Sequence, residues 1–178
     1  IPAHVVRRNV FRRPPGLDLR QAALLEPLSC VVAGVQRLDL VGRDTVLVMG
    51  AGPMGLLFVT LLKQCGVPRV IVLGKRKIRL EAAAKLGADA VIDLDQTEDP
   101  VAAVRDLAPG GVCTAVECVG RPTAWSMAVD CLRKGGEALF YGGCPTGTSL
   151  AVDTRRMHYD ALTLKGAFHF TPTDVRIS

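Results

Sequence analysis

The 178-residue chain has few aromatic residues and no long uninterrupted apolar run. Phe, Trp and Tyr together make up 4% of it, which leaves few rings on which nucleic-acid bases could stack. The longest uncharged stretch is interrupted by glycines and Pro53, so no segment has the composition of a membrane span. We therefore expect no nucleic-acid partner and no membrane partner, despite a formal net charge of +5.

The chain also lacks a Cys-x-x-Cys pair and a signal-peptide pattern. Its six cysteines are scattered, and several lie in apolar patterns, as reduced cysteines do in the core of a cytoplasmic protein. No apolar h-region follows the first residue. We expect a cytoplasmic location. Because Ile1 takes the place of a start methionine, we also expect a piece of a longer protein.

Strand patterns alternate with helix patterns along most of the chain. This order predicts right-handed crossovers and an α/β fold with a doubly wound parallel sheet and helices on both faces. The strands are predicted at 45–49, 69–73, 90–93, 112–117, 137–141 and 162–166, and the helices at 53–65, 77–86, 99–107 and 122–132.

The first forty residues are less regular. Residues 1–20 are basic and contain prolines, which predicts an extended connector from a preceding domain. Residues 21–40 have a helical pattern that we expect to be interrupted at Pro27. The folded domain is accordingly predicted to cover residues 21–178.

A glycine-rich turn follows the first predicted strand. Gly50, Gly52 and Gly55 form Gly-x-Gly-x-x-Gly, and Pro53 and Met54 open the next helix. In a strand-turn-helix context this spacing is the Rossmann fingerprint, in which backbone amides hold a diphosphate at a helix N-terminus. The alternative, a tight turn without a ligand, is less consistent with that context.

The residues after the second strand indicate which dinucleotide binds. NAD sites place an acid there to bind the ribose hydroxyls, about twenty residues beyond the glycines. This chain has Gly74, Lys75 and Arg76 instead, and no acidic residue from Thr45 to Leu80. Cations would pair with a 2′-phosphate that an acid would repel, so the pattern predicts NADP(H) in preference to NAD(H).

Three further features in this region are open to two interpretations. Arg79 is either a further phosphate partner or a helix-surface charge. The turns after the fourth and fifth strands either approach the coenzyme or are ordinary glycine turns. Their residues are Cys118, Val119, Gly120, Tyr141, Gly142 and Gly143. A site for S-adenosylmethionine or a nucleotide sugar would require an acid after the second strand, which is missing.

The chain resembles the coenzyme domain of the zinc-containing medium-chain alcohol and polyol dehydrogenases. The resemblance rests on Glu26-Pro27-Leu28-Ser29, Gly50–Gly55, Arg79-Leu80, Ala84-x-x-Gly87-Ala88-Asp89, Glu117–Gly120, Gly135-Gly136, Tyr141–Gly143 and Leu162–Gly166. Glu-Pro-Leu-Ser is similar to the sorbitol dehydrogenase and ketose reductase branch. The resemblance implies hydride transfer between NADP(H) and a polyol, secondary alcohol or ketone, with zinc polarising the carbinol oxygen. It also implies a homodimer or tetramer.

The resemblance makes Glu26 a candidate ligand, or water-mediated partner, of the catalytic zinc in a full-length enzyme. Without the resemblance, Glu26 would be interpreted as an acid favoured at a helix start. The family's GroES-like catalytic domain, which carries the other zinc ligands, is absent, and Ala33 replaces a frequent histidine. The resemblance also implies a C-terminal truncation, because the chain ends at Ser178, before the family's final segment. We therefore expect this chain to bind coenzyme without zinc and without turnover. The alternative is a non-catalytic NAD(P)-sensing or interaction module.

Overall fold

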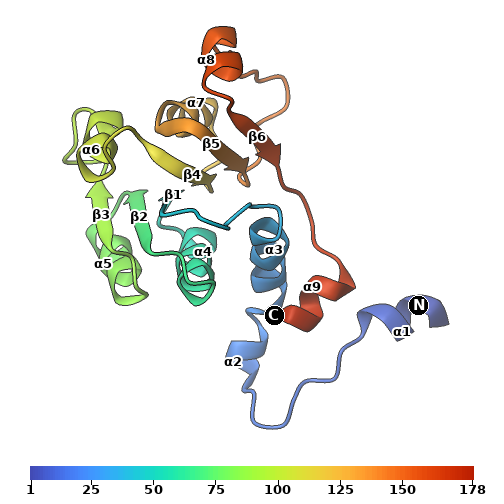
Figure 1. Ribbon diagram of the computed structural model, residues 1–178. Coiled ribbons are helices and arrows are strands. Elements are labelled where there is room, and N and C mark those ends of the chain that lie inside the picture. The colour runs from blue at the N-terminus through green and yellow to red at the C-terminus, as the bar shows by residue number, and fades with distance from the viewer.

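The computed structural model describes residues 1–178, and its centre is a six-stranded parallel sheet (Figure 1). The strand order is β3-β2-β1-β4-β5-β6. The strands are β1 (Thr45–Met49), β2 (Arg69–Gly74), β3 (Ala90–Asp93), β4 (Val112–Glu117), β5 (Leu132–Phe140) and β6 (Thr163–Gly166). The predicted Rossmann-type doubly wound sheet is confirmed.

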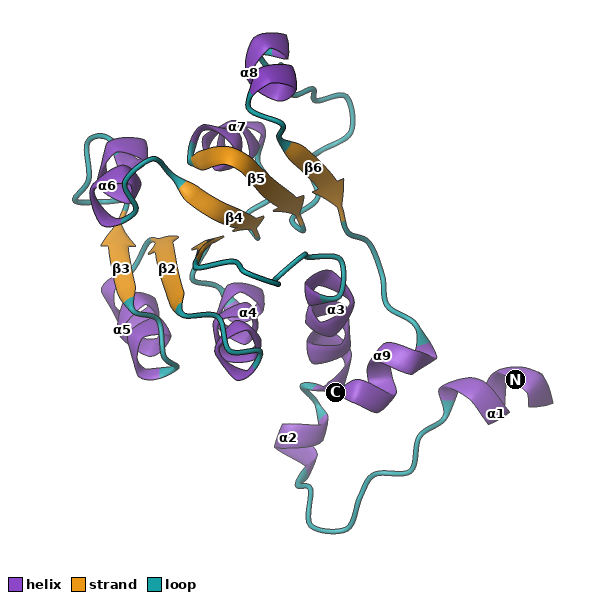
Figure 2. Cartoon of the chain, in the orientation of Figure 1, coloured by secondary structure: helices purple, strands orange, loops and turns teal.

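Helices cover both faces of the sheet (Figure 2). They are α1 (Ala3–Asn9), α2 (Leu19–Ala22), α3 (Leu25–Val35), α4 (Pro53–Gln64), α5 (Lys77–Lys85), α6 (Pro100–Leu107), α7 (Pro122–Asp130), α8 (Thr154–Tyr159) and α9 (Pro172–Ile177). None of these helices combines the length and the apolar character that crossing a membrane requires.

Two apolar cores form because successive side chains of a strand point to opposite faces. On β1, Leu47 and Met49 belong to the core under α6 and α7, whereas Val46 and Val48 belong to the core under α3, α4 and α5. Both faces are thus buried, which explains why the parallel strands are apolar throughout rather than alternating.

The sheet topology brings the ends of its central strands together. In the parallel register, Met49 of β1 lies opposite Leu73 of β2 on one side and Glu117 of β4 on the other. Glu117 in turn lies opposite Phe140 of β5. The order of strands reverses between β1 and β4, and ligands of doubly wound sheets bind in the crevice beyond such a reversal.

Residues 1–20 are not the extended connector that the sequence predicted. Residues 3–9 form α1, which contains none of the prolines, and Asp18 caps α2 with a capping box. The segment between the two helices has no regular secondary structure and contains a turn at Pro15-Gly16, and α1 has no buried residue. The prolines and arginines of this stretch therefore do not prevent a short local helix.

The predicted helix break at Pro27 is also wrong. Helix α3 begins at Leu25, so Pro27 occupies its third position, where a backbone N–H would have no intrahelical partner. Its missing donor consequently costs nothing there, and Leu28 already donates to the carbonyl of Leu24 at 2.9 Å. The break lies instead before Leu25, between α2 and α3.

Two boundaries near the fifth strand differ from the prediction. Helix α7 ends at Asp130 rather than near Leu132, and β5 begins at Leu132 instead of Glu137. Its early part pairs through Val112 and Leu132, and the register then shifts at an irregularity before Thr114 and Glu137. The glycine pair at 135–136 lies in this irregular part, within β5 rather than before it.

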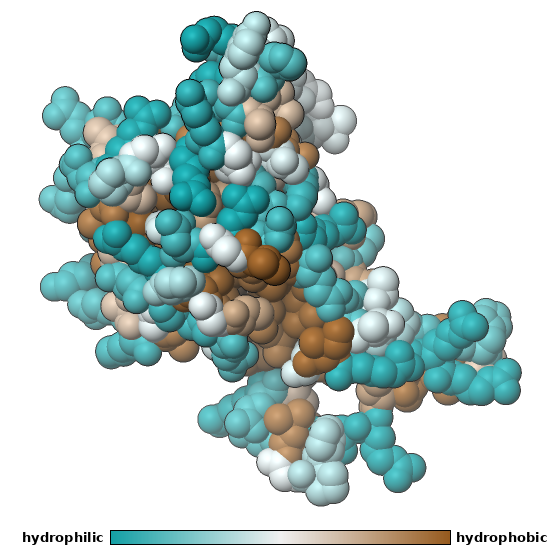
Figure 3. Space-filling model, in the orientation of Figure 1, coloured by the Kyte–Doolittle hydropathy of each residue, from teal (hydrophilic) through white to brown (hydrophobic).

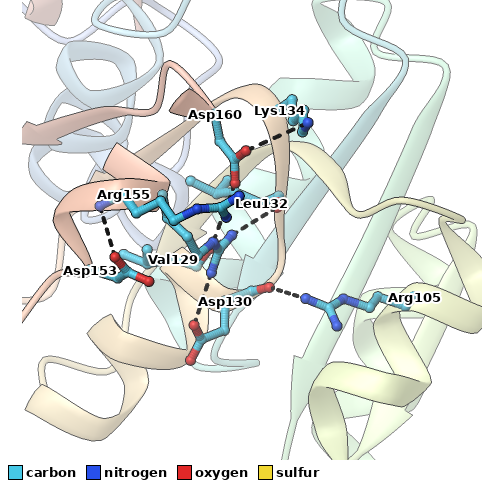
Figure 4. A network of polar contacts seen from close by, with 9 residues as sticks. Arg105, Val129, Asp130, Leu132, Lys134, Asp153, Arg155 and Asp160 are labelled. Carbon is cyan, nitrogen blue, oxygen red and sulfur yellow. Dashed lines mark hydrogen bonds and ion pairs between the residues drawn. The ribbon is translucent and has the colours of Figure 1, made fainter. Parts of the chain in front are cut away.

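The polar connection before β6 contains helix α8, which the sequence analysis did not predict. Arg156 on α8 pairs with Asp130 at 3.1 Å and with Asp160 at 3.5 Å, and also donates to the carbonyls of Val129 and Leu132. Figure 4 shows these partners converging from α7, β5 and α8. The short helix is thus held by tertiary contacts that an isolated sequence segment does not reveal.

Candidate coenzyme-binding site

The glycine turn between β1 and α4 has an open side and a closed side. Gly50 has a φ of +105°, and its N–H donates to the Leu73 carbonyl at 2.7 Å. A Cβ on Gly55 would lie 1.8 Å from the Gly50 carbonyl oxygen, so only glycine fits there. A Cβ on Gly52 would meet nothing within 4 Å.

The open side of this turn faces the N-terminus of α4. Gly52 is the N-cap of the helix and has no side chain that could satisfy the first N–H groups, and Pro53 and Met54 form the first turn. Unsatisfied amides at the positive end of a helix dipole bind anions. The geometry of the turn is compatible with the diphosphate site expected from the sequence, which stays a prediction.

Gly74 at the end of β2 packs directly against the glycine turn. A Cβ there would lie 2.8 Å from the Ala51 Cβ and 3.1 Å from the Ala51 nitrogen. An acid at position 74 would require the turn to move. Packing against Ala51 is thus a structural reason for the missing acid at this position.

The basic residues after β2 have different surroundings. Lys75 forms an exposed ion pair with Asp95 at 2.7 Å, an acid that follows β3 and that the sequence analysis did not take into account. Arg76 is the N-cap of α5 with a φ of +70°, and its exposed side chain has no hydrogen bond or ion pair. Arg79, one turn later, is also exposed and unpaired. Of the cations predicted to bind a phosphate, Arg76 and Arg79 can therefore pair with a ligand without breaking an ion pair.

The turns after β4 and β5 adjoin the glycine turn. Cys118 donates its N–H to the Met49 carbonyl at 2.9 Å, and the Val119 side chain lies 3.1 Å from the position of a Cβ on Gly50. A Cβ on Gly120 would lie 2.5 Å from the Gly143 carbonyl oxygen. The predicted residues of the three turns therefore form one continuous surface at the carboxyl ends of the strands.

Glu117 is a residue of this region that the sequence analysis quoted but gave no role. It is fully buried, and its Oε1 accepts the N–H groups of Val119 at 2.6 Å and Gly120 at 2.9 Å. Burial raises the pKa of Glu117, and these two hydrogen bonds only partly oppose it. The sequence feature that could have pointed to Glu117 is an acidic residue at the end of the buried strand β4.

Cys118 and Tyr141 lie in surroundings that keep both groups neutral. Burial, assisted by the neighbouring Glu117 carboxylate, raises the pKa of the Cys118 thiol. Burial also raises the pKa of the Tyr141 phenol, whose ring packs edge-on against Phe58 with centroids 4.9 Å apart. A thiol with a raised pKa is a poor nucleophile, consistent with Cys118 having no role in covalent catalysis.

Glu26 lies in the first turn of α3. Its Oε1 accepts a weak hydrogen bond from the Cys30 thiol at 3.5 Å, and Cys30 neighbours Tyr141. Glu26 also lines a cavity of about 430 Å³ together with Ser29, His169 and Phe170. No three His, Cys, Asp or Glu side chains of the chain come together as metal ligands. The residues present do not make a zinc site around Glu26.

Hydrophilic residues cover most of the periphery of the face shown in Figure 3, and hydrophobic ones gather towards the middle. The exposed side chains with an apolar surface include Val119, which is 47% exposed and lies on the β4 turn. An exposed valine among glycines offers a flat apolar contact beside the polar glycine turn. Such a combination suits a ligand that has both a diphosphate and a flat ring.

Comparison with protein families identifies this arrangement. A family model described as zinc-binding dehydrogenase matches residues 53–177. The chain belongs to this zinc-binding dehydrogenase family. The matched part is the coenzyme-binding part of these enzymes, which agrees with the resemblance inferred from the sequence.

Individual relatives support the same assignment. The chain is 31% identical over 165 residues to sorbitol dehydrogenase of Bacillus subtilis, covering 92% of this chain and 46% of the relative. It is 30% identical over 151 residues to D-arabinitol dehydrogenase 1 of Uromyces fabae, covering 83% and 43% respectively. The chain thus spans about half the length of these curated relatives.

A solved structure shows the same fold with a coenzyme in place. A zinc-binding dehydrogenase from Sinorhizobium meliloti 1021, bound to NADP, matches with a TM-score of 0.86 and 27% identity. The match covers 93% of this chain and 49% of that protein. Family and fold are therefore established by two independent comparisons, of sequence and of structure.

Proposed function

We propose that the carboxyl ends of β1, β2, β4 and β5 bind NADP(H). The diphosphate would lie on the open side of the glycine turn, where Gly52 leaves space and the α4 amides are unsatisfied. The nicotinamide half would lie over the turns after β4 and β5, and the adenosine half over the end of β2. The open space at Gly52 is the observation that carries this proposal.

The 2′-phosphate of the coenzyme would pair chiefly with Arg76. This side chain is exposed and has no partner, and Gly74, two positions before it, has no acid that could repel a phosphate. Arg79 would contribute from the next turn of α5. Lys75 would contribute only after leaving Asp95, with which it now pairs. The preference for NADP(H) over NAD(H) rests on this arrangement.

In the complete protein we propose hydride transfer between NADP(H) and a polyol, a secondary alcohol or the corresponding ketone. The relatives named sorbitol and D-arabinitol dehydrogenase support this substrate class. The nicotinamide ring would supply the hydride chemistry, and the residues described here would bind and orient it. Glu26 would lie near the catalytic metal of such an enzyme, whereas this chain by itself would bind coenzyme without turnover. Pairing of two copies along β6 would form the homodimer.

The second candidate is a non-catalytic NAD(P)-sensing or interaction module. The observation that favours it is the missing cluster of metal-ligating side chains in these 178 residues. A polypeptide that joins the catalytic part of the family to this chain separates the candidates. When it is mixed with zinc, NADP⁺ and a polyol, it should produce NADPH if the chain serves an enzyme and none if the chain is a sensing or interaction module.

Titration calorimetry of the chain with NADPH and with NADH tests the binding proposal. We expect NADPH to bind more tightly, because only it carries the 2′-phosphate. Equal affinities, or tighter binding of NADH, would contradict the role of Arg76. If neither nucleotide binds, the coenzyme site itself is refuted.

A further inference from the structure

Glu117 connects the turns after β4 and β5. Its side-chain Oε1 accepts the N–H groups of Val119 and Gly120 in the first turn, at 2.6 and 2.9 Å. Its main-chain carbonyl accepts the N–H groups of Tyr141 and Gly142 in the second turn, at 3.0 and 2.8 Å. One residue therefore holds both turns in place.

The other carboxylate oxygen of Glu117, Oε2, has no partner. It is the one buried side-chain oxygen or nitrogen of the chain without a hydrogen bond. It lies against the β5 turn, since a Cβ on Gly142 would be 3.0 Å away. The neighbouring indole N–H of Trp125 donates to the Gly142 carbonyl at 2.9 Å instead. An unsatisfied buried acceptor is costly, and burial accordingly raises the pKa of Glu117, whereas the Val119 and Gly120 amides on the other oxygen favour its charged form. No cation of the chain pairs with that charge.

The other titratable groups facing this carboxylate do not supply a charge. They are the thiols of Cys118 and Cys144, whose pKa values burial raises, with a further contribution from Glu117 itself. Both thiols therefore stay neutral, and the carboxylate of Glu117 is the single charge beneath the two turns. An unpaired charge in a poorly solvated position acts over several ångströms with little screening.

We propose that Glu117 is a positioning residue whose unpaired carboxylate makes the site favour the oxidised coenzyme. This inference rests on the proposed function, which puts the nicotinamide ring over the turns that Glu117 holds. The oxidised ring carries a positive charge and the reduced ring is neutral, so a carboxylate beneath them stabilises only the former. Glu117 thereby influences the relative affinities of the two redox states of the coenzyme.

The substitution Glu117→Gln tests this, because glutamine keeps an acceptor for the Val119 and Gly120 amides and removes the charge. We expect the affinity of the full chain for NADP⁺ to fall on the order of tenfold, as for the loss of one partly screened charge. The affinity for NADPH should change by less than about twofold, because its ring is neutral. Glu98→Gln, the same change at an exposed acid, leaves both affinities unaltered. An equal loss for both forms, or no loss, would overturn the proposal.

A second measurement uses the unaltered chain, in case Glu117→Gln does not fold. In the benzamide analogue of NAD⁺, a neutral benzene ring replaces the charged pyridinium ring at almost the same shape. We expect the chain to bind NAD⁺ on the order of tenfold more tightly than this analogue. Equal affinities would refute the role of the charge. Failure of the chain to bind any of these nucleotides would refute the coenzyme site instead, so the two failures are distinguishable.

Discussion

Two glycines of one turn have opposite surroundings, and each therefore responds differently to the same added methyl group. Gly55 touches the Gly50 carbonyl, whereas Gly52 faces open space. Packing within the protein leaves no room for a side chain at Gly55. At Gly52 the space is open, and a ligand could occupy it.

The substitution Gly52→Ala should abolish tight coenzyme binding while leaving stability nearly unchanged. Its φ of −82° and ψ of 179° suit alanine, and the methyl group would occupy the space that the diphosphate needs. We expect the free energy of unfolding in urea to change by less than about 0.5 kcal/mol. Gly55→Ala is the matched comparison and should destabilise the protein by about 1–3 kcal/mol. Normal coenzyme affinity in Gly52→Ala would refute this placement of the diphosphate.

Reversing the charge of Arg76 tests the phosphate site. Arg76→Glu should weaken NADPH binding by about 1–3 kcal/mol, the scale of a charge-assisted contact, and leave NADH binding nearly unchanged. Calorimetry measures both. Lys85→Glu makes the same charge change at the exposed far end of α5 and should have little effect on either nucleotide. If the two variants behave alike, Arg76 acts only through the net charge.

Among individual residues, the sequence predicted those whose role depends only on residues nearby in the chain. The glycine turn and the cations after β2 follow from spacing within one strand-turn-helix unit. Asp95 and the orphaned oxygen of Glu117 could not be inferred, because they depend on which strands are neighbours. Asp95 reaches Lys75 from the end of β3, and Glu117 lies under a turn contributed by β5.

The edge element β6 is fixed to the sheet by a buried ion pair. Lys165 on β6 contacts Glu137 on β5 at 2.6 Å, and the Glu137 side chain is 2% exposed. The other oxygen of Glu137 accepts the N–H of Asp39, in the segment that links α3 to β1. Removing the cation would leave a buried carboxylate without its counter-charge.

We accordingly expect Lys165→Met to lower the free energy of unfolding by roughly 2–3 kcal/mol, somewhat less than for a fully buried pair because Lys165 is partly exposed. Lys134→Met breaks an exposed pair with Asp160, at 3.9 Å, and should cost less than about 1 kcal/mol. Urea unfolding followed by Trp125 fluorescence measures both variants. Equal costs would show that burial does not determine the contribution of the ion pair.

The connection between α5 and β3 contains a group that makes stability depend on pH. Partial burial tends to raise the pKa of Asp89, but the Val70 amide and the Lys63 ammonium outweigh it, and the net pKa lies below its ordinary value. The Val70 N–H and the Lys63 Nζ lie 2.7 and 3.0 Å from Oδ2. A lowered acid pKa adds stability above the unfolded-state pKa, which is lost as pH falls through the folded-state pKa.

Asp89→Asn should therefore flatten the acid side of the stability profile. Urea unfolding between neutral pH and about pH 3 should show a smaller loss for the variant than for the unaltered chain. Glu98→Asn removes an exposed acid with no resolved partner and serves as the comparison. A variant profile parallel to that of the unaltered chain would contradict the assigned role of Asp89.

Elements with a strong period and a clear cap were predictable from the sequence. The strands β1, β3 and β4 coincide with their predicted ranges, because buried parallel strands are short apolar runs bounded by polar or glycine residues. Helix α3 was not predictable in this way, because the effect of Pro27 depends on whether the proline lies in the first turn of the helix. Helix α8 depends on Arg156 reaching α7 and β5, which local propensity does not encode.

As a whole, the molecule is the coenzyme-binding part of a zinc-binding dehydrogenase and spans about half of its relatives. Its sheet brings four turns to one edge, and the glycine turn leaves one open place among them. The proposed function requires a nucleotide to occupy that edge in one orientation, with the diphosphate at α4 and the adenosine at β2.

A crystal structure of the chain with NADP tests this orientation most directly. We predict that the diphosphate lies against the amides at Gly52–Gly55 and that the 2′-phosphate lies within hydrogen-bonding distance of the Arg76 guanidinium. A complex in which Arg76 points into solvent, or in which the diphosphate lies away from the glycine turn, would contradict the account.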